Sequence, residues 1–411
     1  MTTETRPDEP KQRDWATDYD IFDPQYVREP YPVWDELRDK CPVAHTDNWG
    51  GSWMPTKYAD LFAIAQDIEH FSSREILVAP VAPPGGFDPE ATPFYGVGAP
   101  PISADPPVHT WTRKMLLPHF SIKAVAPYEE ETRELCNKLI DKFIATGRGD
   151  AAVDYAQQIP PRIIGSMLGV PEGMADTFID WVRNLLEIGL SKPEVRGPAR
   201  IALLTFLDKQ INERRANPRD DDLMSRLIET EIDGEPVPHQ ILLGMCLLLV
   251  VAGIDTTWSS IGSALWHLAQ HPEDRQRLIN EPELMPNAVE ELLRVYSPVT
   301  MARLMNSDYE YNGCPMKADD RVIMNFPAAN RDPEKFEDPD KVILDRKHNP
   351  HIAFGVGIHR CAGSNLARME MRISIEEWLK RIPDYRLEDP SAVTWAGGQV
   401  RGPRQLAVVF P

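Results

Sequence analysis

The stretch that decides the fold is Asn349-Pro350-His351-Ile352-Ala353-Phe354-Gly355-Val356-Gly357-Ile358-His359-Arg360-Cys361-Ala362-Gly363. Its single cysteine, Cys361, ends a loop punctuated by glycines, and the apolar period predicts a helix directly after it, over residues 362–379. A helix N-terminus favours a thiolate, because its free N–H groups and its macrodipole stabilise negative charge. Gly355 and Gly357 permit turns that bring further N–H groups toward the sulfur, and Gly363 leaves room for a flat cofactor. The stretch predicts a metal thiolate, with a buried cysteine in a glycine-rich turn as the alternative.

The uninterrupted pattern Phe-Gly-x-Gly-x-His-x-Cys-x-Gly resembles the haem-binding loop of the cytochrome P450 family. The resemblance implies a mainly α fold with small β-sheets, haem b as cofactor and O2 as co-substrate. It also implies that Cys361 is the axial ligand of the haem iron, with Phe354, His359 and Gly363 beside the haem. A thiolate ligand pushes electron density onto iron and favours cleavage of a bound O–O bond.

Composition narrows the class of protein. The chain has 411 residues, 42% of them hydrophobic, which is enough for a large core. Because no linker divides it, we expect one domain over residues 15–411 after a disordered polar tail, residues 1–14. The net charge of -19 excludes nucleic acid as a partner. The tail is neither a signal peptide nor a membrane anchor. The longest apolar run, residues 241–254, is too short for a membrane span and predicts a core helix.

Five scattered cysteines without a CxxC pair indicate reduced thiols and hence a cytoplasmic protein, which we expect to be a monomer. Beyond the stretch already quoted, the apolar pattern predicts helices and short strands along the rest of the chain. Helices are expected over 31–40, 57–68, 108–120, 122–146, 155–168, 174–188, 200–216, 221–229, 238–270 and 286–296. Strands are expected within 41–54, 299–305, 309–311, 321–325 and 385–410.

The middle of the expected helix 238–270 reads Ala252-Gly253-Ile254-Asp255-Thr256-Thr257. A buried aspartate without a cationic neighbour in sequence is costly, and such a local conflict is typical of a functional site. Gly253 would let the helix open locally, and Thr256 can bond back to a carbonyl one turn away. The alternative is a kinked helix with a solvated aspartate. The resemblance implies that Asp255 relays protons and that Thr256 hydrogen-bonds the bound dioxygen.

Two further patterns gain meaning from the resemblance. His109 and Arg113 lie at i and i+4, hence on one helix face, and match the family's haem-propionate ligands; Arg303 and His359 match further ones. An ordinary exposed pair is the alternative for the first two. The pattern Glu291-Leu-Leu-Arg294, together with Arg346, resembles the family's structural Glu-Arg-Arg network, which supports the haem loop rather than catalysis.

Residues 72–107 are irregular and rich in proline and glycine, which favours a lid over a substrate cavity; a loose surface excursion is the alternative. The resemblance implies that this loop determines specificity. Because the expected pocket is mostly apolar, we predict a small or medium hydrophobic organic substrate. The expected pocket residues are Phe94, Tyr95, Leu248, Val251, Ala252, Val299, Met301 and Val400.

The chain carries neither a flavin nor an iron–sulfur motif, so electrons must come from a separate ferredoxin and its reductase, with NAD(P)H used only indirectly. A basic cluster near the cysteine loop, on an otherwise acidic chain, predicts docking of an acidic ferredoxin. The cluster consists of Lys114, Arg360, Arg368 and Arg372. The predicted activity is that of a haem-thiolate monooxygenase acting by hydroxylation or oxidative dealkylation.

Three other functions compete with this prediction. A peroxygenase of the same fold would need no acid–alcohol pair, and this chain has one. A non-catalytic haem sensor or carrier would need neither Asp255 and Thr256 nor a docking surface. A zinc site using His351, His359 and Cys361 has a spacing that fits no common zinc pattern.

Overall fold

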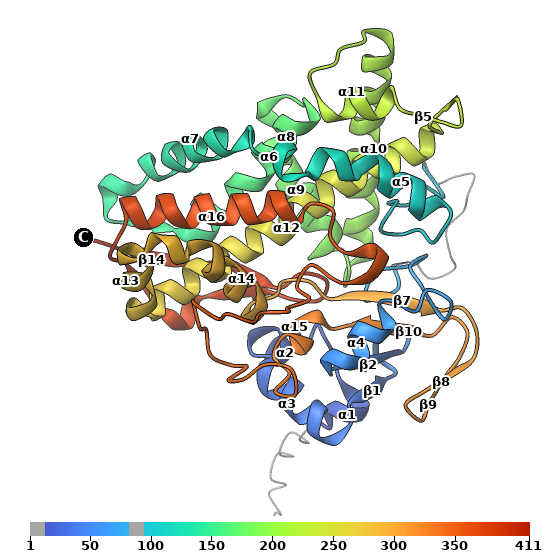
Figure 1. Ribbon diagram of the computed structural model, residues 1–411, viewed down its shortest axis with the longest axis horizontal. Helices are drawn as coiled ribbons and strands as arrows, with labels where there is room; N and C mark the ends of the chain where they lie inside the picture. The colour runs from blue at the N-terminus through green and yellow to red at the C-terminus, as the bar shows by residue number, and fades with distance from the viewer. Residues whose placement is uncertain (1–12, 82–93) are drawn as a thin grey trace, which may run out of the picture.

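The long helix α12 (His239–Gln270) runs through the middle of the molecule in this computed structural model, which describes residues 13–81 and 94–411 (Figure 1). It packs against α8 (Ile159–Leu168), α16 (Ser364–Arg381), α10 (Pro193–Ala216) and α9 (Ala175–Leu186). The prediction of a mainly helical fold with small sheets is therefore confirmed.

By length and composition alone, α12 could cross a membrane, since its most apolar window has a mean hydropathy of 2.0. However, 67% of that window is buried inside the molecule. A helix that is apolar on all sides is expected in the core of a large protein, and α12 occupies that position. The interpretation of residues 241–254 as part of a core helix agrees with this packing.

The other predicted helices are present with shifted ends. Residues 122–146 were expected to form one helix but are divided at Pro127, whose ring is incompatible with the interior of a helix. Gly147 ends this region in the left-handed conformation, with φ 68°, as the sequence predicts. The remaining helices are α1 (Trp15–Asp18), α2 (Pro24–Arg28), α3 (Tyr31–Lys40), α4 (Tyr58–Ile64), α5 (Val108–Leu116), α6 (Ile122–Val125), α7 (Tyr128–Asp141), α11 (Leu223–Ile228), α13 (Pro272–Asn280), α14 (Met285–Val295) and α15 (Phe326–Ala329).

The start of the described chain corrects the expected tail. Residues 1–12 lie outside the described part, but Asp14 caps α1 by accepting a hydrogen bond from the Ala16 amide at 3.1 Å. Trp15 and Tyr19 then join a hydrophobic cluster with α3 and the first strands. Asp14 therefore belongs to the fold rather than to a disordered tail.

In the described part of the chain, the largest sheet has the strand order β1-β2-β10-β7-β3 and forms the lower part of the molecule in Figure 1. It joins strands from both ends of the chain, because β10 lies between β2 and β7. The strands are β1 (Val43–Thr46), β2 (Ser52–Pro55), β3 (Phe71–Ser72), β7 (Met301–Met305) and β10 (Arg321–Met324). Smaller sheets contain β4 (Arg148–Asp150), β5 (Glu231–Ile232), β6 (Glu235–Pro236), β8 (Tyr309–Tyr311), β9 (Cys314–Met316), β11 (Arg386–Leu387), β12 (Thr394–Ala396), β13 (Gly402–Gln405) and β14 (Ala407–Val409).

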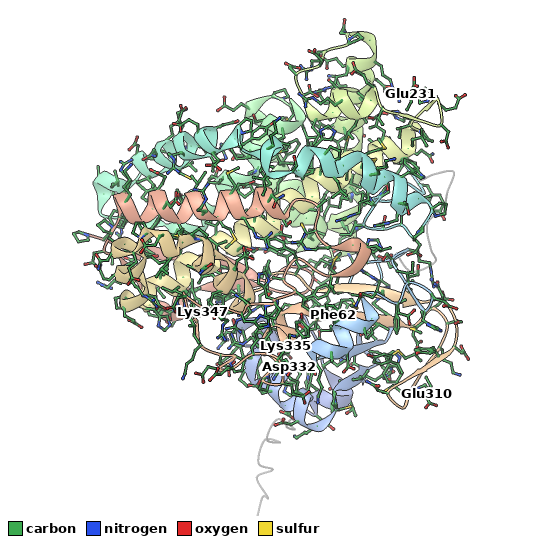
Figure 2. The ribbon with its side chains drawn as sticks, viewed as in Figure 1. Phe62, Glu231, Glu310, Asp332, Lys335 and Lys347 are labelled. Atoms are coloured by element: carbon green, nitrogen blue, oxygen red, sulfur yellow. The ribbon has the colours of Figure 1, made fainter. Side chains whose placement is uncertain are left out.

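The irregular segment before the cysteine loop is anchored to α4. Asp332 accepts a hydrogen bond from the Tyr58 amide at 2.7 Å, and Lys335 lies over the Tyr58 ring. Figure 2 labels Asp332 and Lys335 near Phe62 of α4. The Tyr58 hydroxyl donates to the Pro350 carbonyl at 2.7 Å. These bonds fix the entry to the cysteine loop against the sheet-rich part of the molecule.

Candidate active site

The cysteine loop is a rigid turn closed by its own backbone. The Cys361 amide donates to the Phe354 carbonyl at 2.7 Å. Gly355 and Gly357 have φ of 68° and 75°, and a Cβ at Gly357 would stand 2.6 Å from the Ala65 carbonyl oxygen. Only glycine fits at that position. Helix α16 begins at Ser364, two residues later than expected, so Cys361 lies just ahead of its first turn.

The Cys361 sulfur has an environment suited to a ligand thiolate. Burial raises the thiol pKa, while a hydrogen bond from the Gly363 amide and the positive charge of Arg113 lower it. The side chain is nonetheless exposed. Protein atoms nonetheless surround the sulfur closely enough for burial to raise its pKa, and we interpret the exposed face as opening onto an internal space. A metal cation in that space would favour the thiolate outright.

Several side chains in the middle of α12 are not fully buried. Leu248, Val251 and Thr256 are only partly buried and Ala252 is exposed, although most of their neighbours on this core helix are buried. Their spacing of three, four and eight residues places them on one face of the helix.

Helix α12 is helical at every residue, so the expected local opening at Gly253 is wrong. A Cβ at Gly253 would lie 3.1 Å from Ile164, so the glycine permits close packing of α8 instead.

Four basic side chains from distant parts of the chain meet beside the cysteine loop. The rings of His109 and His359 lie 4.3 Å apart, and the His109 Nε2 lies 3.1 Å from the Ile358 carbonyl. Arg113 donates to the Arg360 carbonyl. Burial, followed by the charges of Arg303, His109 and Arg113, lowers the pKa of His359 to about 3.

Arg303 is the least compensated of these cations. It is 4% exposed, and within the described residues its one hydrogen bond is to the carbonyl of its neighbour Ala302, at 2.8 Å. Burial lowers its pKa to about 10, and the nearby carboxylate of Asp105 is occupied by Ser72 and Ser73. A buried guanidinium without a paired anion calls for one from outside the chain. The cluster fits the propionates of a haem placed over Cys361.

Asp255 has a cationic partner that the sequence did not suggest. Arg404, on β13, donates to the Asp255 Oδ1 at 2.7 Å and to the Glu187 Oε2 at 2.8 Å. The Asp255 Oδ2 is buried without a hydrogen-bond partner. Burial raises the pKa of Asp255, while Arg404 lowers it. Ser259 also donates to Oδ1, at 3.4 Å. Nothing in linear sequence links Arg404 to Asp255, because packing of β13 on α12 alone brings them together.

Thr256 bonds back along the helix as expected, donating from Oγ1 to the Ala252 carbonyl at 2.8 Å. This places the hydroxyl on the partly exposed face of α12. Since its proton is engaged with Ala252, the oxygen presents lone pairs to the internal space and can accept a hydrogen bond there.

The structure brings Glu291, Arg294 and Arg346 together in one cluster, in which Glu291 and Arg294 are fully buried and Arg346 is partly buried. The Glu291 carboxylate accepts from Arg294 at 2.8 and 2.9 Å and from Arg346 at 3.0 and 3.1 Å. It also accepts from the Asn349 side chain at 3.1 Å and the Ile343 amide at 2.9 Å. The guanidinium of Arg294 also donates hydrogen bonds to the carbonyls of Asn330, Pro339 and Lys341. The cluster ties α14 to the segment that leads into the cysteine loop.

The expected pocket residues are brought together only in part. Val299 and Val400 form a β-bridge, and Met301 begins β7 directly after it. Phe94 packs against the main core, whereas Tyr95 is 50% exposed. Residues 82–93 of the expected lid lie outside the described part. The end of the segment approaches α12 closely, since a Cβ at Gly244 would stand 2.5 Å from the Gly98 carbonyl.

The four residues of the expected docking patch, Lys114, Arg360, Arg368 and Arg372, are not equally available. Arg368 bonds to Glu290 at 2.5 and 2.8 Å, and Arg372 bonds to Glu129 at 2.9 Å. The sequence could not show this pairing, because the carboxylates come from other helices. Lys114 and Arg360 are exposed, and neither forms an ion pair within residues 13–81 and 94–411. The freely available charge of the patch is therefore smaller than predicted.

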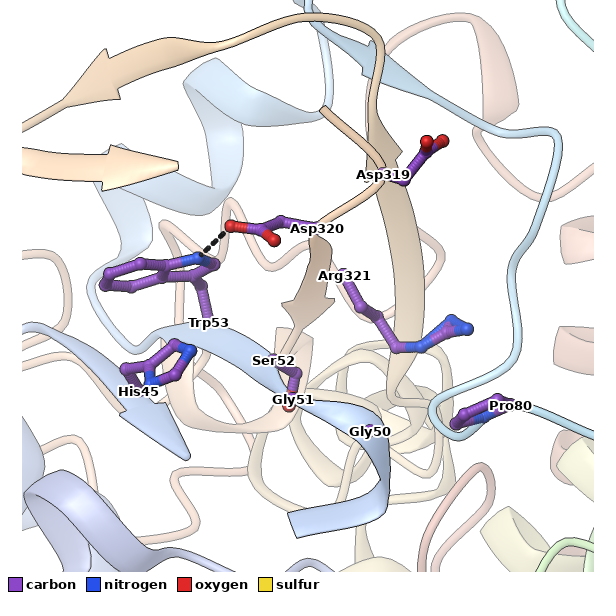
Figure 3. Close-up of a pocket in the computed structure, with 9 residues that line it drawn as sticks. All are labelled: His45, Gly50, Gly51, Ser52, Trp53, Pro80, Asp319, Asp320 and Arg321. Carbon is purple, nitrogen blue, oxygen red and sulfur yellow. Dashed lines mark hydrogen bonds between the residues drawn. The ribbon is translucent and has the colours of Figure 1, made fainter. Parts of the chain in front are cut away.

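The zinc alternative is not supported, because two of its ligands are engaged elsewhere. His351 pairs with Glu290 at 2.9 Å, and His359 bonds to Ser73 at 2.9 Å. A separate small pocket of about 100 Å³ lies beside β2 and contains none of the predicted site residues (Figure 3). It is lined by His45, Gly50, Gly51, Ser52, Trp53, Pro80, Asp319, Asp320 and Arg321.

Comparison with known proteins agrees with this geometry. The model of the cytochrome P450 family matches residues 198–383. The chain is 31% identical to the mycinamicin IV hydroxylase/epoxidase of Micromonospora griseorubida, over 91% of this chain and 94% of that protein. It is 34% identical to a steroid C26-monooxygenase of Mycolicibacterium smegmatis, over 75% of this chain and 79% of that protein.

A solved structure of a related protein has the same fold. Cytochrome P450 CREJ in complex with (4-ethylphenyl) dihydrogen phosphate superposes with a TM-score of 0.86 at 27% identity, covering 96% of this chain and 99% of that one. The superposition extends over nearly the whole chain, and the range 198–383 that the family model matches contains the cysteine loop, the helix α12 and the Glu291 cluster. The chain belongs to the cytochrome P450 family, and it is a P450 monooxygenase.

Proposed function

We propose that this monooxygenase uses haem b and O2 to insert one oxygen atom into a small or medium hydrophobic organic substrate, by hydroxylation or oxidative dealkylation. The observation that carries the proposal is the juxtaposition around Cys361. An exposed thiol ends the cysteine loop, the uncompensated Arg303 lies near His359 of the same loop, and α12, whose partly exposed face carries Thr256, packs against the helix that follows Cys361. We further propose that residues 14–411 form one domain that acts as a monomer in the cytoplasm.

Haem, when bound, supplies the redox centre at which O2 is activated. Cys361 would hold it through its thiolate, which the Gly363 amide helps to stabilise. His109, Arg113, Arg303 and His359 would hold its propionates, which offsets the cost of burying these cations. A pocket wall of Leu248, Val251, Ala252, Val299 and Val400 excludes water and favours apolar substrates.

Asp255 would deliver protons to this space, while Arg404 holds the carboxylate in position. The free Oδ2 of Asp255 can carry a proton, because burial raises the pKa of that carboxyl group. Arg404 holds the other oxygen and links it through Glu187 to Arg183, whose guanidinium is 37% exposed. This chain of charged groups connects the interior to the surface. Thr256 would accept a hydrogen bond at the end of the path, beside Ala252. A peroxygenase would need no such path.

Replacing Thr256 with Ala is expected to uncouple electron use from product formation. Without the hydroxyl, protons reach the oxygen species without control, and peroxide leaves instead of product. Product formed per NAD(P)H should fall about tenfold, which corresponds to the loss of one hydrogen bond worth about 1.4 kcal/mol. Product and peroxide would be measured with any compound that shifts the haem spin state.

Thr256→Ser is the matched control, because it retains the hydroxyl at the same position. We expect it to keep most of the coupling. If Thr256→Ala remained as well coupled as the wild-type enzyme, the role given to Thr256 would be wrong.

The electron donor in this proposal is a separate ferredoxin with its reductase, which uses NAD(P)H. Support comes from Lys114 and Arg360, two unpaired cations beside the Cys361 loop on a chain of net charge -19. Opposite charge on the partner would steer it to this face. Arg368 and Arg372 contribute less to direct contact, since carboxylates of this chain already occupy them.

Arg360→Gln is expected to weaken binding of a plant-type ferredoxin about tenfold, because it removes an unpaired charge at the interface. Arg372→Gln changes the formal charge equally, but its guanidinium is already bonded to Glu129. We expect an effect of about threefold or less for that variant, from long-range steering alone. Dissociation constants at two ionic strengths would be compared. Equal losses for both variants would contradict the choice of Arg360 over Arg372.

A further inference from the structure

Two arginines on one face of α10 stand where the irregular segment 72–107 meets the helix. Arg196 and Arg200 are one turn apart, at i and i+4. Arg200 donates to the Val97 carbonyl at 2.5 Å. The Nε of Arg196 is buried and has no hydrogen-bond partner among residues 13–81 and 94–411. The turn before α10 presses on the base of Arg196, since a Cβ at Gly189 would stand 2.6 Å from the Arg196 Cβ.

A third arginine approaches from the sheet. Arg321, on β10, donates to the Leu77 carbonyl at 3.0 Å, and Figure 3 shows its guanidinium reaching toward the segment that carries Pro80. Burial lowers the pKa of Arg321, as it lowers that of Arg196 and of Arg200. All three cations are therefore partly removed from water, where an unpaired charge is costly.

Too few carboxylates lie near these arginines to neutralise their positive charge. Within the described residues, none of the three forms an ion pair, and Glu75 is the one carboxylate whose field reaches both Arg196 and Arg321. Its Oε1 is already occupied by the amides of Ile76 and Leu77, at 3.0 Å each. Among the described residues, three cations against one carboxylate leave a local positive excess on a protein whose overall charge is -19. Such an excess in a partly dry site fits a bound anion.

The positive cluster adjoins the walls of the expected pocket. The Ile76 carbonyl accepts from the Ala302 amide on β7 at 2.9 Å, and the Val78 amide donates to the Gln399 side chain at 3.0 Å. Ala302 follows the pocket residue Met301, and Gln399 precedes Val400. On the other side, Val97 leads to Gly98, which packs on α12 at Gly244, one turn before Leu248. A molecule that extends along the α12 face toward this segment would end at the arginines.

We propose that Arg196, Arg200 and Arg321 bind the carboxylate of an amphipathic organic acid, whose hydrocarbon part lies along the α12 face. The inference rests on the proposed function and narrows its substrate class from any hydrophobic compound to hydrophobic acids. Guanidinium forks bind carboxylates through paired hydrogen bonds, and the Nε of Arg196 supplies a donor that is otherwise unused. The anchored acid would fix which carbon of the chain lies over Cys361.

The test uses matched pairs of ligands with the haem-loaded enzyme. Dodecanoate would be compared with dodecan-1-ol, and 4-phenylbutanoate with 4-phenylbutan-1-ol, by titrating the spin-state shift of the Soret band. We expect the acid of at least one pair to bind about tenfold more tightly than its alcohol, as one charge-assisted contact allows. If neither acid bound more tightly than its alcohol, the proposal would be overturned.

Variants then distinguish the effect of the carboxylate-binding arginines from the effect of the rest of the pocket. Arg196→Gln and Arg200→Gln should each remove most of the preference for the acid, leaving alcohol binding within about twofold. Arg215→Gln, an exposed arginine on the same helix that bonds to His239, is the control and should keep the preference. Equal weakening of acid and alcohol would assign the arginines a structural role and overturn the proposal. The carbon monoxide spectrum of every variant reports the haem thiolate independently, so a failure of the proposed function would be recognised separately.

Discussion

Glu291→Ala is expected to yield no stable haem-loaded protein. The Glu291 carboxylate is 0% exposed and accepts hydrogen bonds from Arg294 and Arg346. Its removal would leave the Arg294 guanidinium, also 0% exposed, as an uncompensated buried charge. Breaking a buried ion pair in this way costs about 3–5 kcal/mol. That is a large part of the roughly 5–15 kcal/mol by which proteins of this kind are stable.

Soluble yield, the ratio of haem to protein absorbance and the urea midpoint would measure the effect. Glu283→Ala is the matched control, because Glu283 is exposed just before the same helix α14. It should change the free energy of unfolding by no more than about 0.5 kcal/mol. Wild-type haem content and urea midpoint in Glu291→Ala would show that the cluster does not support the cysteine loop.

Cys361→Ala is expected to abolish monooxygenase activity while leaving the fold intact. The side chain is small and exposed to an internal space, so its loss opens no new cavity in the packed core. Loss of the thiolate removes the ligand itself, and even groups behind a ligand contribute about 10–100-fold to metal affinity or activity. Turnover should therefore fall more than about a hundredfold.

Cys41→Ala is the control for that experiment, because Cys41 is a half-buried thiol at the end of α3 that donates to the Val43 carbonyl. It should keep both haem and activity. Substantial turnover by Cys361→Ala, with haem bound, would mean that another residue ligates the iron.

Most features that the sequence predicted rest on local patterns of residues. The cysteine loop, the conflict at Asp255 within an apolar helix and the spacing of Glu291 and Arg294 are each contained in a few consecutive residues, so the sequence displays them directly. The bounds of α3 were predicted to the residue, and those of α12 to within one residue. Where a local breaker was overlooked, as at Pro127, the prediction joined two helices into one.

Contacts between distant segments could not be read from the sequence. Arg404 reaches Asp255 across 149 residues, and Glu129 reaches Arg372 from another helix. Both partners change the electrostatic argument, the first by compensating a buried carboxylate and the second by occupying a predicted docking arginine. The arginines Arg196, Arg200 and Arg321 were overlooked for the same reason. Arg321 is far from Arg196 in sequence, and only the fold shows that the field of one carboxylate, Glu75, is shared between them.

The central claim is that Cys361 is the thiolate ligand of a haem iron in this enzyme. The most direct test is the absorption spectrum of the dithionite-reduced, carbon-monoxide-bound protein. The account predicts a strongly red-shifted Soret band, which is lost in Cys361→Ala and retained in Cys41→Ala. A Soret band at the position of a histidine-ligated haem, or the absence of bound haem from intact folded protein, would contradict it.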